Sequence, residues 1–414
     1  MTERAMTGPT APLSILDLAP VSEGSSPGQA LRNTLDLARR AEALGYRRYW
    51  VAEHHFTPGV AASSPAVLIA AIAAATSSIR VGSGAVQLGH QSAATVVEAF
   101  GTLSELYPGR IDLGIGRSSQ RRREAAAREA ARAEQARAEQ ASVEQARVEQ
   151  ASPEPAGPRV VNGLLIPARF YAERRRSPRL AAQEAVLMQP GAHTPDFADQ
   201  VDDIRALLAG TYESSGIAFE AMPGTGADAE LWILGSSGGQ SARVAGELGL
   251  PFAANYHVSP STTLEAVEAY RAAFRPSAVR TKPYIMVSAD AVVAETDERA
   301  HELAAGYGLW VRSVRGATGA MRFPAPETVA ASAWTDEDRA FVEDRVSTQF
   351  TGSPTTVAKQ LRVLQEAAGA DEVLVTTITY EHEDRVRSYE LLAREWGQAS
   401  RPASEAWPRG LTRG

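Results

Sequence analysis

Short apolar segments of strand length alternate with longer amphipathic segments along this chain. The apolar segments lie at residues 13–19, 47–53, 79–86 and 110–117, and segments with helical spacing follow the first three at 29–44, 64–76 and 93–106. The first helical segment ends at Gly45, and its apolar positions are Leu31, Leu35, Ala38, Ala41 and Leu44. Strands roughly thirty residues apart with a helix between them are typical of parallel βαβ units.

The same alternation returns after residue 195. Further strands are predicted at residues 230–234, 251–255, 284–293 and 372–379. Helices are predicted at residues 195–210, 241–248, 261–274, 298–311, 336–346, 355–368 and 383–396, with an irregular stretch at 312–334. The first units fit a doubly wound sheet as well as a barrel. Eight strands, each followed by helical material, are the count of a (β/α)8 TIM barrel, and we predict that α/β fold.

A long insertion interrupts the regular pattern after the fourth strand, at residues 118–190. Within it, residues 131–155 repeat a five-residue unit rich in Ala, Arg, Glu and Gln. Five residues advance a helix by about 500°, so the repeat forms no apolar stripe and is predicted to be a solvated helix or a disordered segment. The stretch from 160 to 190 has no firm assignment, and we interpret it as a lid or a surface excursion.

The domain organisation follows from these patterns. We predict a disordered tail at residues 1–11, one barrel domain at 12–398 that contains the insertion, and a flexible tail at 399–414. The N-terminal residues lack the apolar core of a signal peptide, and apolar runs such as 66–75 are too short to span a bilayer. We therefore expect a cytoplasmic protein that does not bind a membrane.

Composition removes several kinds of chemistry. The 414 residues include no cysteine, so disulfides, thiolate metal sites and a cysteine nucleophile are excluded. The formal net charge is −7, which argues against a general role in nucleic-acid binding.

Candidate functional residues follow three of the predicted strands. Glu53, His54 and His55 come directly after the second strand, where α/β enzymes place their chemistry. A run of small residues from Gly235 to Ser241 lies between a strand and a helix, where backbone N–H groups can bind an anion. A plain glycine turn is the alternative for this run. His257 lies at the end of a later strand and repeats the placement of the first pair.

Five motifs, taken together and in this order, resemble the bacterial-luciferase-like family of flavin-dependent monooxygenases. They cover nearly the whole chain outside the insertion. The motifs are Glu53-His54-His55-Phe56, Val81-Gly82-Ser83-Gly84-Ala85, Gly109 to Arg117, Gly235-Ser236-Ser237-Gly238 and Gly249-Leu250-Pro251.

The resemblance implies a TIM barrel that binds reduced FMN at the C-terminal ends of its strands. Oxygen then adds at the flavin C4a carbon, and the resulting (hydro)peroxide oxygenates the substrate. His54 matches the catalytic histidine of the family, His55 is expected to position it, and Gly84-Ala85 matches a non-prolyl cis peptide under the flavin. The cofactor-binding residues implied are Ser83, Gly84, Ala85, Gly116, Arg117, Gly235, Ser236, Ser237 and Gly238, with Arg117 and the serine loop at the phosphate.

Two further expectations concern metal and light. Neighbouring residues at a strand end point in opposite directions, so His54 and His55 do not make a ligand pair and no metal is expected. Gly116 stands where luciferase has a reactive cysteine, which argues against light emission.

The partners expected are a small organic substrate, a separate flavin reductase and a second copy of the chain. A reductase is needed because no GxGxxG motif follows a strand, and the homodimer is implied by the resemblance. Two alternatives remain open at this point. One is a deazaflavin-dependent oxidoreductase on the same barrel. The other is a non-catalytic flavin-binding or partner-binding protein, against which the presence of His54 and Arg117 argues.

Overall fold

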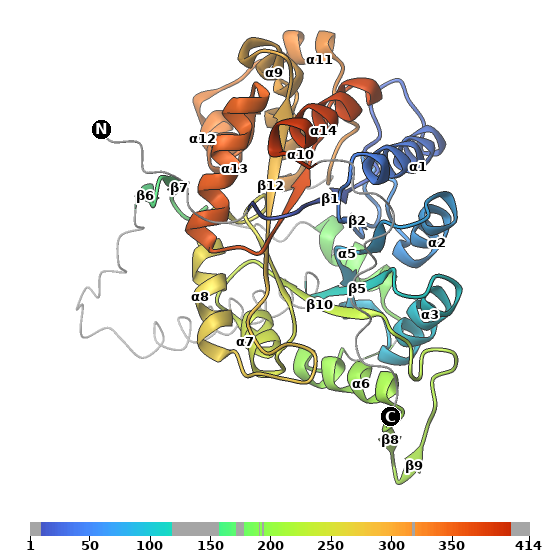
Figure 1. The fold of residues 1–414 in the computed structure, drawn as a ribbon. Helices are drawn as coiled ribbons and strands as arrows, with labels where there is room; N and C mark the ends of the chain where they lie inside the picture. The colour runs from blue at the N-terminus through green and yellow to red at the C-terminus, as the bar shows by residue number, and fades with distance from the viewer. Residues whose placement is uncertain are drawn as a thin grey trace, which may run out of the picture.

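A computed structural model describes residues 10–117, 157–170, 178–189, 191–192, 194–316 and 319–398. The predicted repeat at 131–155, most of the N-terminal tail and the whole C-terminal tail lie outside these residues. The described part forms a closed barrel of parallel strands surrounded by helices (Figure 1). Its eight strands are β1 (Leu13–Asp17), β2 (Arg48–Val51), β3 (Arg80–Ser83), β5 (Ile111–Gly116), β10 (Glu230–Gly235), β11 (Phe252–Asn255), β12 (Ile285–Val293) and β14 (Glu372–Thr376).

The strand order around the barrel is β10-β11-β12-β14-β1-β2-β3-β5, and pairing of β5 with β10 closes it. Each of these pairings is parallel, with Ile115 opposite Ile233 at the closure. The TIM-barrel prediction and all eight predicted strand positions are therefore confirmed.

The helices that cover the barrel follow the strands as predicted. They are α1 (Pro27–Ala43), α2 (Pro65–Ala75), α3 (Ala93–Leu106), α6 (Phe197–Ala209), α7 (Gln240–Glu247), α8 (Thr263–Ala273), α13 (Pro354–Ala368) and α14 (His382–Trp396). Helix α1 shows why they form. The hydroxyl of Ser26 caps its first turn by accepting from the Gln29 amide, and Leu37, Ala38 and Ala41 are buried against the barrel.

The region after β12 differs from its prediction. The prediction of a single helix at 298–311 is wrong. The chain forms two helices here, α9 (Asp297–Ala304) and α10 (Tyr307–Arg315), and Gly306 lies at the start of the second. The stretch expected to be irregular contains the end of α10 and the short helix α11 (Pro326–Ala331). Helix α12 (Asp336–Val346) was predicted, and the short strand β13 (Phe350–Gly352) pairs in parallel with the end of β12.

Several small elements connect the main ones. The described part of the insertion holds the hairpin β6 (Arg159–Val161) and β7 (Leu164–Ile166) and the helix α5 (Pro178–Leu187), none of which was assigned from the sequence. A second hairpin, β8 (Glu213–Ser214) and β9 (Ile217–Ala218), follows α6. Strand β4 (Val86–Gln87), the short helix η1 (Leu88–His90) and the short helix η2 (Pro260–Thr262) complete the chain.

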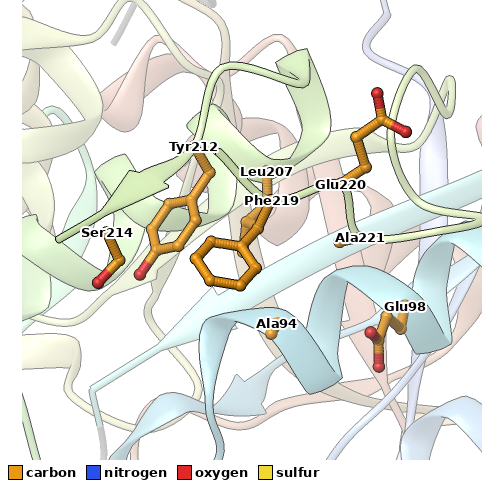
Figure 2. Close-up of a pocket in the computed structure, with 8 residues that line it drawn as sticks. All are labelled: Ala94, Glu98, Leu207, Tyr212, Ser214, Phe219, Glu220 and Ala221. Atoms are coloured by element: carbon orange, nitrogen blue, oxygen red, sulfur yellow. The ribbon is translucent and has the colours of Figure 1, made fainter. Parts of the chain in front are cut away.

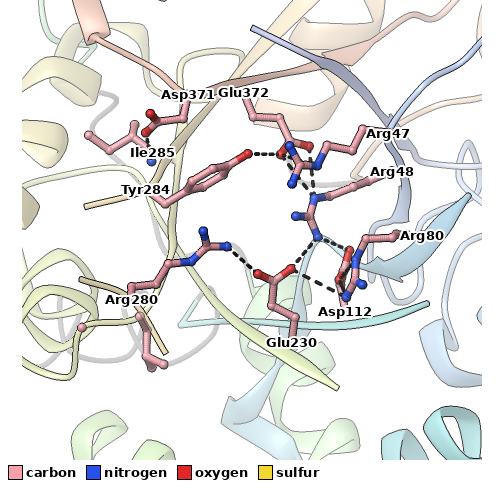
Figure 3. A network of polar contacts seen from close by, with 12 residues as sticks. Arg47, Arg48, Arg80, Asp112, Glu230, Arg280, Tyr284, Ile285, Asp371 and Glu372 are labelled. Atoms are coloured by element: carbon pink, nitrogen blue, oxygen red, sulfur yellow. Dashed lines mark hydrogen bonds and ion pairs between the residues drawn. The ribbon is translucent and has the colours of Figure 1, made fainter. Parts of the chain in front are cut away.

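A network of charges fills the end of the barrel where the strands begin (Figure 3). Arg48 is 1% exposed, and its Nη1 lies 2.8 Å from Asp112 Oδ2 and 2.7 Å from Glu230 Oε2. Its Nε donates to Glu372 at 3.2 Å. These side chains point into the barrel, and Trp50 and Trp232 pack edge to face above them, with 5.1 Å between ring centroids. We call this network of Arg48, Asp112, Glu230 and Glu372 the barrel floor, because it fills the end where the strands begin. The functional site of such a barrel is expected at the opposite end.

Candidate functional site

The C-terminal ends of the strands bring the predicted site residues to one end of the barrel. His54 follows β2, the Gly84–Ala85 peptide follows β3, and Arg117 follows β5. The loop from Gly235 to Gly238 begins with the last residue of β10, and His257 follows β11. Because all eight strands are parallel, residues that are up to 203 positions apart in sequence meet around one opening, which we call the mouth.

Glu53 organises the polar groups beside His54. It is 3% exposed, and its Oε1 lies 2.7 Å from Nε2 of His55 and 2.9 Å from Nε2 of His90. Burial would raise the pKa of this carboxyl, but hydrogen bonds from His55, His90 and the Gln87 amide outweigh it and lower the pKa to about 2. Glu53 is therefore ionised and accepts from both imidazoles.

The donor set of Glu53, His55 and His90 has the composition of a metal site, with its three donor atoms within 4.8 Å of one another. Both imidazoles nevertheless converge on the same carboxylate oxygen at hydrogen-bond distances. We interpret the group as a hydrogen-bonded cluster. The sequence indicated Glu53 and His55 through the Glu-His-His run, but it gave no sign that His90 joins them.

The same carboxylate fixes the chain that follows β3. Gln87 donates its backbone N–H to Glu53 Oε2 at 2.8 Å, and its side-chain amide donates to the Glu53 carbonyl at 2.6 Å. Two residues before Gln87, the Gly84–Ala85 peptide bond is cis, which confirms what the resemblance implied. The ends of β2 and β3 are therefore held together beside the mouth.

Ser83 differs from the other candidates after β3. Its hydroxyl donates to the Gly114 carbonyl at 2.8 Å and accepts from the Gly114 amide at 3.0 Å, and the residue is fully buried. These bonds hold β3 to β5, so the side chain stabilises the sheet.

Arg117 and the Gly235–Gly238 loop lie on neighbouring strands. Because Ile115 pairs with Ile233, Arg117 and Gly235 each come two residues beyond the same pair. The loop leads into α7, whose first turn has no side-chain cap, so its N–H groups are available to an anion. An arginine, two serines and an uncapped helix terminus suit the phosphate of a nucleotide-type cofactor.

Three glycines at this part of the mouth pack closely against neighbouring residues. A Cβ on Gly116 would lie 3.2 Å from Cβ of Ala85, and a Cβ on Gly235 would lie 2.9 Å from the Phe252 ring. A Cβ on Gly238 would lie 3.1 Å from Glu265 Cγ. Side chains at these positions would collide with neighbouring residues, so the glycines permit this close packing of the chain.

The opposite wall of the mouth is polar, and most of its residues were not predicted. His257 Nδ1 lies 2.5 Å from the Ser288 hydroxyl, and burial, Arg345 and His54, in that order, lower the pKa of His257 to about 3. Nη2 of Arg345 lies 3.3 Å from Asp290 Oδ2 and 2.9 Å from the hydroxyl of Tyr307. The sequence could indicate His257 by its place after a strand, but Arg345 comes from α12, far along the chain.

Both described parts of the insertion contact the rim of the mouth. Gln183 on α5 donates to the His55 carbonyl at 2.8 Å, and a small cavity of about 180 Å³ lies between α5 and Phe56. On the other side, Tyr256 at the end of β11 donates to the Leu165 carbonyl of β7 at 2.7 Å. Three strands separate β2 from β11 in either direction around the barrel, so the two contacts lie across the mouth from each other.

A larger cavity lies elsewhere on the molecule (Figure 2). It has a volume of about 350 Å³ and lies between α3, α6 and the segment around the β8–β9 hairpin. Its lining is Ala94, Glu98, Leu207, Tyr212, Ser214, Phe219, Glu220 and Ala221, which includes no predicted site residue. The cavity belongs to the outer layer of the barrel.

Comparison with known proteins identifies the family. The model described as luciferase-like monooxygenase matches residues 12–214 and 191–372. The chain is 37% identical to the Bacillus subtilis protein YvbT, over 93% of this chain and 96% of YvbT. It is 33% identical to a luciferase-like monooxygenase of Escherichia coli K12, over 93% of this chain and 97% of that protein. The chain therefore belongs to the luciferase-like monooxygenase family and is a monooxygenase, an oxidoreductase.

Two further likenesses add detail. The crystal structure of apo-MsnO8 matches with a TM-score of 0.71 at 32% identity, covering 94% of this chain and 99% of that one. The N-acetyl-S-alkylcysteine monooxygenase of Bacillus subtilis is 49% identical over 106 residues, which are 26% of this chain and 32% of that protein.

More distant structures share the fold alone. One is the oxygenating constituent of 3,6-diketocamphane monooxygenase in complex with FMN, with a TM-score of 0.57 at 19% identity, covering 93% of this chain and 98% of that one. Another is an F420-dependent secondary alcohol dehydrogenase, with a TM-score of 0.55 at 13% identity, covering 94% and 99%. The first of these two proteins binds FMN and the second uses F420. Among the described residues, no helix is both long enough and apolar enough to cross a membrane.

Proposed function

We propose that this chain is an FMN-dependent monooxygenase that receives reduced FMN from a separate reductase and oxygenates a small organic substrate with O2. The observation that carries the proposal is the convergence of His54, Arg117 and the Gly235–Gly238 loop at one end of the barrel. When bound, reduced FMN supplies two electrons, so that one oxygen atom enters the substrate and the other leaves as water. A homodimer in the cytoplasm remains our expectation.

The residues of the chain have separable roles in this proposal. Arg117, Ser236, Ser237 and the first turn of α7 hold the phosphate, and the backbone at Gly84–Ala85 supports the ring system. His54 handles the proton, and because its Nδ1 is buried, Nε2 is the nitrogen that exchanges it. Glu53 and His55 position the chain around His54.

In this proposal the insertion excludes water from the site. Helix α5 and the β6–β7 hairpin contact opposite sides of the rim through Gln183 and Leu165. Covering the mouth in this way keeps water from the reacting groups, which oxygen chemistry on a flavin requires.

The test separates FMN from the deazaflavin alternative. The purified protein is titrated anaerobically with reduced FMN and, in parallel, with a reduced deazaflavin coenzyme, and each complex is then mixed with air. We expect binding and an oxygen-dependent spectral change with FMN, and substrate oxidation in a panel that includes N-acetyl-S-alkylcysteines. Binding of only the deazaflavin, without any oxygen-dependent change, would replace the proposal by the hydride-transfer alternative.

A further inference from the structure

The wall of the mouth formed by β12 and β14 lies directly across the barrel from the proposed flavin support. Between β12 and β3, the strand order places β14, β1 and β2 on one side and β11, β10 and β5 on the other. A substrate that reacts at a flavin supported by Gly84–Ala85 would therefore have β12 and β14 behind it.

The strand registers show which side chains face into the barrel from this wall. Glu372 points inward, because it bonds the interior residues Arg48 and Ser14. Side chains alternate along a strand, so Thr376, four residues later, points inward as well. Thr376 pairs with Asp290 of β12, and paired residues of parallel strands share a face. The side chains of Thr376 and Asp290 therefore both lie inside the barrel near the mouth.

Two buried polar atoms in this wall have no hydrogen-bond partner among the described residues. They are the Thr376 hydroxyl oxygen and Arg345 Nε, on residues that are 2% and 7% exposed. Buried polar groups without partners are rare because each costs roughly 1–3 kcal/mol. Arg345 Nε can only donate and the Thr376 hydroxyl can donate, so an acceptor oxygen is the one group that would satisfy both.

The charges already present in this wall determine whether a charged or a neutral acceptor oxygen can bind there. Arg345 already faces the Asp290 carboxylate, with Tyr307 donating to the same oxygen. His257, a titratable group that interacts with Arg345, is bonded to Ser288 and carries no charge at neutral pH. Burial raises the pKa of Asp290 even beside Arg345, so this wall already disfavours negative charge. A second carboxylate would add buried negative charge, whereas a neutral carbonyl would not.

We propose that Thr376, Arg345 and Asp290 form a substrate-recognition subsite that binds a neutral carbonyl oxygen of the substrate. The inference rests on the proposed function, because it places the substrate between this wall and the flavin. It assigns Thr376 as a direct hydrogen-bond donor and Asp290 as the residue that holds Arg345 in place.

The neighbouring residue Thr377 gives a matched control. Its hydroxyl points to the outer side and donates to the Ala291 carbonyl at 2.7 Å. Thr377→Val therefore removes a hydroxyl that is bonded within the protein. Thr376→Val, by contrast, removes a hydroxyl without a described partner and leaves a side chain of similar shape.

The experiment measures binding of three related thioethers to the FMN-loaded protein by calorimetry. The probes are methyl (benzylthio)acetate, which has a neutral carbonyl, (benzylthio)acetate, which has a carboxylate, and benzyl ethyl sulfide, which has neither. We expect the ester to bind most tightly and Thr376→Val to weaken it about tenfold, the equivalent of one hydrogen bond of about 1.4 kcal/mol. Binding of benzyl ethyl sulfide should not change, and Thr377→Val should bind all three as the wild type does.

Thermal unfolding of the same variants provides the second readout. Thr376→Val should keep or raise the Tm, because it removes an unsatisfied buried group, whereas Thr377→Val should lower it. Wild-type affinity for the ester in Thr376→Val, tighter binding of the carboxylate, or no binding of any probe would overturn the subsite. FMN titration of each variant keeps this result separate from the proposed function, which fails if the folded wild type binds no FMN or shows no oxygen-dependent change with it.

Discussion

The carboxylate of Glu53 accepts a hydrogen bond from the His55 imidazole, with 2.7 Å between Oε1 and Nε2. The same oxygen accepts from His90, and the other oxygen accepts from the Gln87 amide. One buried anion thus connects the end of β2, the chain after β3 and the short helix η1. Its charge state should therefore determine how firmly this side of the mouth is held.

Glu53→Gln should destabilise the protein in a pH-dependent way. The folded-state pKa of Glu53 lies near 2, below its ordinary value of 4.5, so the ionised carboxylate stabilises the fold at every pH above about 4.5. That contribution, roughly 3 kcal/mol, is lost as the pH falls from 4.5 towards 2. Thermal unfolding of both proteins between pH 7 and pH 3 should show a Tm difference that is largest at neutral pH and narrows in acid. A constant difference would show that the charge of Glu53 is not responsible.

His54→Ala should retain flavin binding and lose most turnover. The imidazole lies at the mouth but is not among the groups proposed to hold the phosphate, so its loss removes proton handling, which is typically worth 10²–10⁴-fold. FMN titration measures flavin binding, and steady-state oxygen consumption measures turnover. His55→Ala serves as the comparison, because His55 bonds Glu53 and is expected to act by positioning. Unchanged turnover in His54→Ala would remove that residue from the mechanism.

Arg117→Ala should weaken FMN binding by about tenfold to a hundredfold, since hydrogen bonds between charged groups contribute about 1.5–3 kcal/mol. Fluorescence titration with FMN measures the change, and riboflavin, which lacks the phosphate, should show little difference between variant and wild type. Arg243→Ala is the matched control, because Arg243 lies on the exposed face of α7 beside the same loop. Equal losses in the two variants would mean that overall charge, and not a phosphate contact, explains the effect.

The sequence predicted the barrel well. It predicted only part of the Glu53 cluster and of the opposite wall of the mouth, which holds His257 and Arg345. The eight strands were readable because each is a short apolar run between a loop and a helix, and that signal is local. His55 was readable beside Glu53, whereas His90 joins the cluster from 37 positions further on. Arg345 reaches Asp290 across 55 positions, and no local pattern marks such a pair. The helix break at Gly306 was missed because the apolar spacing continues on both sides of it.

Arg48→Met should cost roughly 3–5 kcal/mol of stability without affecting the mouth. Arg48 is buried against Asp112, Glu230 and Glu372, so its removal leaves carboxylates that have lost a partner in a dry environment. The pKa of Glu230, which burial alone would raise, is held well below its usual range chiefly by Arg48 and then by Arg80 and Arg280, so the loss should be greatest at neutral pH.

Denaturant unfolding measures this cost, and FMN affinity of the folded protein should equal that of the wild type, because the network lies at the opposite end of the barrel. The exposed pair of Arg299 and Glu302 is the control, and Arg299→Met should cost less than about 1 kcal/mol. If both substitutions cost the same, or if Arg48→Met lowers FMN affinity in protein that remains folded, the barrel floor would not be a separate stability element.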